Sequence, residues 1–173
     1  MSRMIDQLLD FTRLRLHGGL PLQRKDVDIL PAIRQVVDEL DNANQEWSIH
    51  LDMTGHGRGH WDADRLCQVF SNLLGNAIQH GEVEGGVGMR VDGLADDRLR
   101  VEIHNGGAIS EAKLSRLFEP LASADDSRGH SQGLGLGLFI THEIVGAHGG
   151  EIRVASDPSR GTTFIVELPR HSG

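Results

Sequence analysis

Four polar side chains in one predicted helix could contact a ligand that carries a Mg²⁺ ion. Asn72 and Asn76 are four residues apart, and Gln79 and His80 follow at the next turn. Residues three or four apart share one side of a helix, so the four lie within a narrow arc. A carboxamide oxygen suits Mg²⁺, which keeps most of its waters and takes few protein ligands. On this helix alone, a solvated edge with a chance spacing is the stronger explanation.

A second candidate is Asn105, at the end of a predicted strand. Val101 and Ile103 point into the core, and the same period of two continues to Asn105. An acceptor there could read the amino group of a purine. The alternative is that Asn105 only begins a turn, which Asn-Gly commonly does, and in isolation this alternative is favoured.

A third candidate is the glycine tract in "RGHSQGLGLGLFITHEIV", residues 128–145. Gly133, Gly135 and Gly137 let backbone N–H groups approach a phosphate, and the helix that follows adds its positive N-terminal end. The tract lacks the Lys-Ser/Thr ending of a P-loop and does not directly follow a strand. Each candidate is weak alone, but the three together at this order and spacing are much stronger.

Helices are predicted from apolar spacing of three and four, and strands from apolar alternation. The predicted helices are 1–17, 28–45, 61–81, 110–121 and 136–150, and the predicted strands are 48–53, 87–91, 99–103, 151–156 and 162–169. Asp28 and Asp62 are the expected N-caps of the second and third helices. Residues 20–28 read as a connector and 54–60 as a glycine-rich loop.

The order of elements predicts an α+β fold. Helices and strands mix without regular βαβ alternation, so we expect helices on one face of a mixed, mostly antiparallel sheet, preceded by a short N-terminal helix. The chain has 173 residues with five Phe, two Trp and no Tyr, so the core must be mostly Leu, Ile and Val.

Charge and composition exclude several classes of function. The net charge is −8 with no block of Lys or Arg, which disfavours nucleic acid or direct membrane contact. The one cysteine, Cys67, excludes an internal disulfide and fits a reducing compartment. There is neither a signal peptide nor an apolar run of 18 residues, so we expect a soluble, cytoplasmic domain.

Four motifs resemble those of sensor histidine kinases. "NLLGNAIQHG" resembles their N box, "HNGGAI" their first glycine box, "LSRLFEPL" their F box and "GLGLGLFI" their second glycine box. The opening "MSRMIDQLLDFTRL" resembles the end of the second helix of the dimerisation and phosphotransfer domain, and "NAIQHG" is similar to phytochrome-linked kinases. The resemblance implies a GHKL-type α/β sandwich, as in Hsp90. It also implies that residues 1–17 are the end of the phosphotransfer helix, that 18–25 are a linker and that 26–173 are the catalytic ATP-binding domain.

The resemblance also implies roles for individual residues. Asn76 would bind Mg²⁺ bridging the phosphates of ATP, with Asn72 beside it as a second catalytic residue. Residues 120–132 would form a lid over the nucleotide. The remaining nucleotide contacts implied are Gln79, His80, Asn105, Gly107, Ile109, Arg128, Gly133, Leu134, Gly135, Leu136, Gly137 and Thr163.

The sequence departs from the family pattern in three places. The usual aspartate of the first glycine box is absent, and either Asn105 or His104 takes its position. Gln79 stands where the N box often has lysine, and Leu121 replaces the second phenylalanine of the F box. The first two changes remove charge near the ligand, and the third changes packing.

None of the ten histidines has the setting of the family's phosphoacceptor. We therefore expect transfer of the ATP γ-phosphate to a histidine on a separate phosphotransfer domain, with a response regulator as partner and a possible homodimer through residues 1–17. His56 and His60 are separated by "GRG", which makes a helical metal pair improbable.

Other uses of this fold are possible. Related ATPases carry a glutamate where this chain has Asn72, which cannot act as a base, so hydrolysis is disfavoured. The helix at residues 1–17 argues against an anti-sigma kinase. A regulatory module that binds nucleotide weakly and only docks partners stays open.

Overall fold

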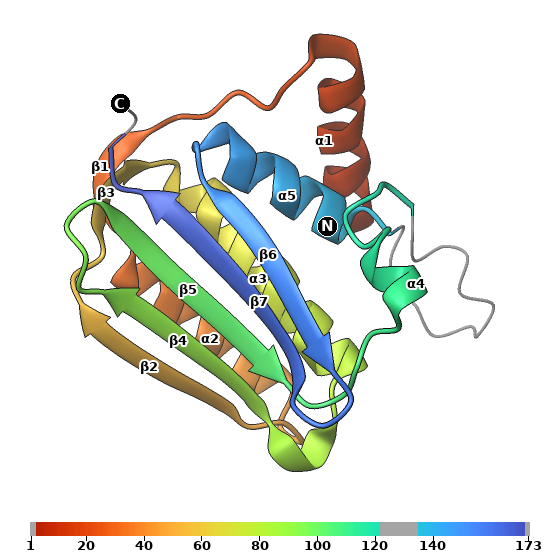
Figure 1. The fold of residues 1–173 in the computed structure, drawn as a ribbon. Coiled ribbons are helices and arrows are strands. Elements are labelled where there is room, and N and C mark those ends of the chain that lie inside the picture. Colours follow the sequence, from red (N-terminus) through yellow and green to blue (C-terminus); the bar gives the residue numbers. More distant parts are fainter. Residues whose placement is uncertain (1–2, 122–134, 172–173) are drawn as a thin grey trace.

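The computed structural model describes residues 3–121 and 135–171, which form two layers. The five strands of one sheet lie in the order β2-β4-β5-β7-β6. Three helices, α2 (Leu30–Ala43), α3 (Ala63–His80) and α5 (Gly137–Ala147), cover one face of this sheet (Figure 1). The strands are β2 (Ile49–Gly55), β4 (Val87–Gly93), β5 (Arg98–Asn105), β6 (Glu151–Asp157) and β7 (Gly161–Pro169).

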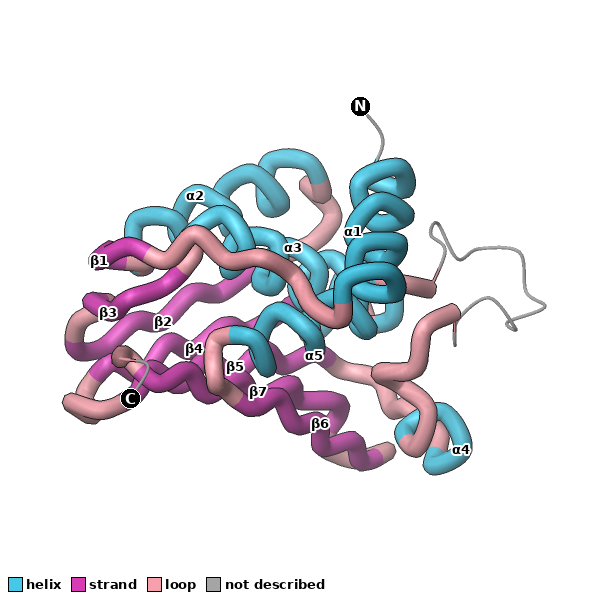
Figure 2. The backbone as a smooth tube through the Cα atoms, turned by 90° about the horizontal axis from the view of Figure 1, so that it is seen from above, coloured by secondary structure: helices cyan, strands magenta, loops and turns pink. Residues whose placement is uncertain are grey.

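The sheet is mixed, as the sequence predicted. β2 pairs with β4 in parallel, and the other neighbours in the sheet are antiparallel. Figure 2, seen from above, shows α2, α3 and α5 together on one side of the strands. The predicted α+β sandwich with helices on one face is therefore confirmed.

The core lies between the layers and follows the predicted periodicities. The six apolar positions predicted on the third helix are all buried in α3, namely Leu66, Val69, Phe70, Leu73, Leu74 and Ala77. They face the buried side chains of β4 and β5, which are Val87, Met89, Val91, Leu99, Val101 and Ile103. Most of the buried core is Leu, Ile and Val, as expected from the scarcity of aromatic residues.

A second, two-stranded sheet was not predicted. β1 (Lys25–Asp28) pairs antiparallel with β3 (Arg58–Trp61), where the sequence suggested a connector and a glycine-rich loop. Both strands are four residues long and polar, so they lack the alternation that marks a strand. Trp61 anchors them because its buried ring donates an Nε1–H bond to the Pro169 carbonyl oxygen at 2.8 Å.

The helix starts agree with prediction in one of two cases. Asp62 caps α3, and its Oδ1 accepts a hydrogen bond from the backbone N–H of Arg65 at 3.2 Å. Asp28 was wrong as the cap of α2, because it ends β1 and the N-cap is Ile29. Within predicted helix 110–121, only α4 (Glu111–Leu114) is α-helical.

The N-terminal helix α1 (Arg3–His17) packs on α3 and α5 rather than on the sheet (Figures 1 and 2). The Phe11 and Phe139 rings meet edge to face, with centroids 5.9 Å apart. Beyond α1, the Gln23 N–H donates to Asp62 Oδ2 at 2.9 Å, and Arg24 donates to the Ala147 carbonyl oxygen at 2.5 Å. Within the described part of the chain, no helix has the length and apolar character needed to cross a membrane.

Candidate functional site

Asn105 and His104 lie on opposite faces of the sheet. β5 alternates buried and exposed residues, so Asn105 faces the helices with 4% of its surface exposed. His104 is exposed on the outer face, where its Nδ1 lies 2.8 Å from Thr163 Oγ1. Of the two residues considered for base recognition, only Asn105 therefore faces the helix layer.

A chain of hydrogen bonds holds the loop after Asn105. The Ile109 N–H donates to Ser156 Oγ at 2.8 Å, and Thr162 Oγ1 donates to the Gly107 carbonyl oxygen at 2.9 Å. Ser156 Oγ and Thr162 Oγ1 are 2.8 Å apart. Because the Thr162 hydroxyl donates its proton to Gly107, the Ser156 hydroxyl is the donor between these two oxygens.

The loop also contacts the end of α3. Gly107 has φ +93°, in the left-handed region that favours glycine, and a Cβ there would lie 3.2 Å from the His80 carbonyl oxygen. A Cβ on Gly81 would lie 3.1 Å from the Asn105 Cβ. The last turn of α3 and the loop after β5 thus lie against each other.

Thr163 does not lie with the other predicted site residues. Its side chain meets His104 on the outer face, whereas Thr162 is 2% exposed and points to the helix side. The inward direction of Thr162 could have been predicted from the sequence. Phe164, Val166 and Leu168 point inward, and the same period of two places Thr162 inward.

Asn72 joins α3 to the first turn of α5. Its Nδ2 donates to the Gly137 carbonyl oxygen and to Thr141 Oγ1, both at 3.3 Å. Thr141, fully buried, donates its own hydroxyl proton to the Gly137 carbonyl oxygen at 2.8 Å. The Asn72 amide nitrogen is therefore committed to positioning α5, and sequence reasoning missed Thr141 because nothing in the helix pattern marks it.

The remaining predicted residues of α3 lie toward its C-terminal end. Asn76 is half-buried, one turn beyond Asn72, and Gln79 and His80 are exposed in the last turn. No group of three or more His, Cys, Asp or Glu residues suited to a metal lies in the described ranges. A single carboxamide fits a Mg²⁺ that takes its other ligands from phosphates and water, rather than a metal caged by protein.

The glycine tract is described only from Gly135 onward, so Arg128, Gly133 and Leu134 lie outside the described residues. Gly135 has φ +71°, and its carbonyl oxygen accepts a hydrogen bond from the Leu121 N–H at 2.9 Å. Leu136 is fully buried and Gly137 begins α5. Leu121, itself at φ 65°, is 48% exposed, so it does not take the packing role of a phenylalanine.

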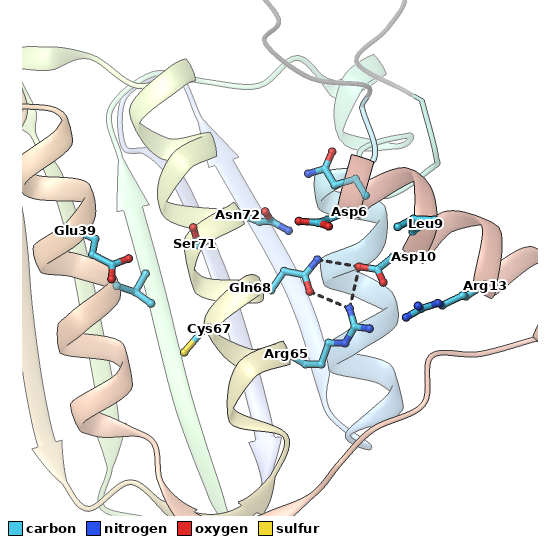
Figure 3. A pocket seen from close by; sticks show the side chains of 12 residues that line it. Asp6, Leu9, Asp10, Arg13, Glu39, Arg65, Cys67, Gln68, Ser71 and Asn72 are labelled. Atoms are coloured by element: carbon cyan, nitrogen blue, oxygen red, sulfur yellow. Dashed lines mark hydrogen bonds and ion pairs between the residues drawn. The ribbon is translucent and has the colours of Figure 1, made fainter. Parts of the chain in front are cut away.

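A cleft among the described residues lies apart from most of these site residues. It has a volume of about 520 Å³ between α1, α2 and α3, and Figure 3 shows its charged lining, with Asp10, Arg65 and Gln68 joined by hydrogen bonds. Asn72 borders it, but Asn76, His80 and Asn105 do not. We place the candidate site along the C-terminal half of α3, which contacts the start of α5 at Asn72 and the loop after β5 at its last turn.

The family of the chain follows from this fold and site. The chain belongs to the histidine kinase-, DNA gyrase B- and HSP90-like ATPases, whose family model matches residues 61–172. It is 36% identical over 171 residues to a Bacteriophytochrome of Pseudomonas aeruginosa, a match that covers 98% of this chain and 23% of that protein. It is 34% identical over 176 residues to the Sensor protein VanS of Enterococcus faecium, covering 98% of this chain and 44% of that protein.

Crystal structures show the same fold. Full-length ShkA in complex with AMPPNP superposes with a TM-score of 0.81 at 26% identity, covering 98% of this chain and 36% of that one. The catalytic domain of the histidine kinase ThkA superposes with a TM-score of 0.73 at 24% identity, covering 87% of this chain and 99% of that one. The chain spans less than half the length of the two curated relatives above.

Proposed function

We propose that this chain is the ATP-binding catalytic domain of a cytoplasmic two-component sensor histidine kinase. It transfers the γ-phosphate of ATP to a histidine on a phosphotransfer domain that lies outside these 173 residues, and a response regulator is the further partner. Residues 1–17 are the end of the phosphotransfer helix and pair with a second copy, 18–25 are the linker and 26–173 are the catalytic domain. The observation that carries this proposal is that α3, the N-box helix, contacts both the glycine start of α5 and the loop after β5.

The roles of individual residues follow from their positions. The Asn76 carboxamide oxygen holds Mg²⁺, which when bound neutralises phosphate charge during transfer. Asn72 and Thr141 fix the start of α5 against α3, so the backbone of Gly135 and Gly137 stays placed for the phosphates. Asn105 and the loop at Gly107 and Ile109 receive the base, and Gln79, His80, Arg128, Gly133, Leu134 and Leu136 complete the contacts.

Asn72 supports transfer over hydrolysis. Hydrolytic relatives need a general base at this position, and an amide has no proton-accepting capacity at neutral pH. In this chain the Asn72 amide also donates to Gly137 and Thr141, which leaves it in a structural role. The acceptor imidazole is then the nucleophile, and the domain contributes positioning and charge neutralisation.

The test combines the chain with Mg-ATP labelled at the γ-phosphate and a phosphotransfer domain of a related kinase. We expect acid-labile label on that domain, absent when its histidine is replaced by glutamine and reduced at least tenfold in Asn76→Ala. Rapid phosphate release without an acceptor, little changed in Asn72→Asp, would show that the domain is a hydrolase.

A second candidate is a regulatory docking module of the same fold. It is favoured by two neutral residues, Asn105 and Gln79, at positions where the family often carries charge. Titration with Mg-ATP and a fluorescent adenine nucleotide separates the two functions. Saturable binding supports the kinase, and its absence leaves only docking.

A further inference from the structure

His148 is buried at the end of α5, and both nitrogens of its ring form hydrogen bonds. With 1% of the residue exposed, Nδ1 lies 2.8 Å from the Ile144 carbonyl oxygen and Nε2 lies 3.1 Å from the Asp62 backbone nitrogen. A carbonyl oxygen only accepts and a backbone N–H only donates, so Nδ1 carries the ring proton and Nε2 carries the lone pair. A second ring proton would therefore have no acceptor in this arrangement.

The chain between α1 and β1 is fastened next to this ring. The Gln23 N–H donates to Asp62 Oδ2 at 2.9 Å, and Asp62 donates its own N–H to His148. Arg24 donates to the carbonyl oxygen of Ala147, the residue directly before His148. Both hydrogen bonds of this chain segment thus lie one contact away from the same imidazole.

A second proton on His148 would disturb both of these hydrogen bonds. The new Nε2–H would point at the Asp62 N–H, so two donors would face each other. The imidazolium would attract the Asp62 carboxylate away from Gln23 and would repel the Arg24 guanidinium. Asp62, from the start of α3, and Arg24, from the segment before β1, are the charged groups that act on the ring, and burial lowers the pKa of His148. The ring is therefore neutral at neutral pH, and the segment is held.

We propose that His148 is a proton-operated latch, whose protonation detaches residues 20–24 from the domain while the helices and the sheet stay folded. The opening is local because Asp62 keeps its second oxygen, Oδ1, on the Arg65 N–H and so still caps α3. The inference rests on the geometry of this joint and not on nucleotide binding. Since residues 18–25 are the proposed linker, acidification would loosen the connection between the phosphotransfer helix and the catalytic domain.

The test follows the Gln23 amide proton of the full chain by NMR hydrogen exchange from pH 8 to pH 4.5. Its protection factor, which is corrected for the intrinsic effect of pH, should be constant above about pH 6.5. Below that it should fall by up to about tenfold per pH unit, because opening takes up one proton. The amides of β5 should keep their protection over the same range.

Two variants identify the group that takes up the proton. His148→Gln keeps an acceptor for the Asp62 N–H but cannot be protonated, so protection of the Gln23 amide should no longer depend on pH. His142→Gln is the matched control, because it removes an exposed histidine of the same helix. It should keep the wild-type profile.

Each outcome decides for or against the latch. Protection of Gln23 that is constant to pH 5, or that falls only where carboxylates titrate, overturns it. An equal fall in His148→Gln overturns it as well, because another group must then take up the proton. Simultaneous loss of protection in β5 would show unfolding of the whole domain instead. The wild-type profile needs no substitution, so the test holds even if His148→Gln fails to fold, and ATP binding is judged separately.

Discussion

Asp10 of α1 and Arg65 of α3 form a largely buried ion pair, with Asp10 Oδ2 2.8 Å from Arg65 Nη1 and 8% and 17% of the two side chains exposed. Gln68 closes the arrangement, donating to Asp10 at 3.2 Å and accepting from Arg65 at 3.1 Å. A pair of this kind contributes little compared with apolar packing, but removing one partner leaves a buried charge without compensation. It therefore specifies where α1 sits on the catalytic domain.

Asp10→Ala is expected to release α1 from the domain. Loss of one partner of a buried pair costs about 3–5 kcal/mol, and a helix of this length is marginal in water on its own. Hydrogen exchange should therefore rise across α1 while the strands of the sheet stay protected. Asp6→Ala is the control, because it removes an exposed acid one turn earlier. It should leave hydrogen exchange in both α1 and the sheet at the wild-type level. Unchanged protection of α1 in Asp10→Ala would show that the pair does not hold the helix.

Asn72→Asp is expected to weaken the joint between α3 and α5. The substitution removes both N–H donors and sets a carboxylate oxygen near the Gly137 carbonyl, so the free energy of unfolding should fall by about 1–3 kcal/mol. Thr141→Val removes the other donor to Gly137 and should cost less, because Asn72 still satisfies that carbonyl. The double substitution should be non-additive in urea denaturation, since both side chains share one acceptor. Strict additivity would contradict the shared contact.

Arg170→Met is expected to destabilise the domain strongly. Arg170 is 2% exposed. Its guanidinium donates hydrogen bonds to Nδ1 of His56 and to four backbone carbonyl oxygens, which are those of His56, Arg58, Gly93 and Ala95. Loss of all the hydrogen bonds of this buried guanidinium should cost about 3 kcal/mol or more. Arg153→Met, at a half-exposed ion pair with Glu167, should stay within about 1 kcal/mol of wild type in the same denaturant titration.

His148 is expected to make stability depend on pH. Burial lowers the pKa of His148, whose Nδ1 donates to the Ile144 carbonyl oxygen while Nε2 accepts from the Asp62 N–H. Because the unfolded chain binds the proton more readily, this contribution to stability is complete above about pH 6.5 and declines as the pH falls below it.

The measurement is the free energy of unfolding from pH 8 to pH 5 for wild type and His148→Gln. The variant should be less stable at pH 8, and the difference should shrink toward pH 5. His171→Gln, an exposed histidine near the C-terminus, should follow the wild-type curve. A constant difference between wild type and His148→Gln across the range would rule out the buried neutral ring as the cause.

The sequence predicted the elements whose apolar periodicity is long enough to be unambiguous. α3 and the β4–β5 hairpin are the examples, and the inward direction of Asn105 followed from the same alternation. β1 and β3 could not be predicted, because their pairing of Lys25 with Trp61 depends on tertiary contact between two short polar segments. Thr141 and Arg170 were missed for a related reason, since each is polar and only the folded chain shows the acceptors it satisfies.

The hydrogen bond from Leu121 to Gly135 brings together the two ends of a thirteen-residue segment. The entropy of closing a chain segment between two joined ends rises slowly with its length, by about 0.6 kcal/mol for each doubling. Insertions and deletions between these two residues should therefore be tolerated without disturbing the sheet.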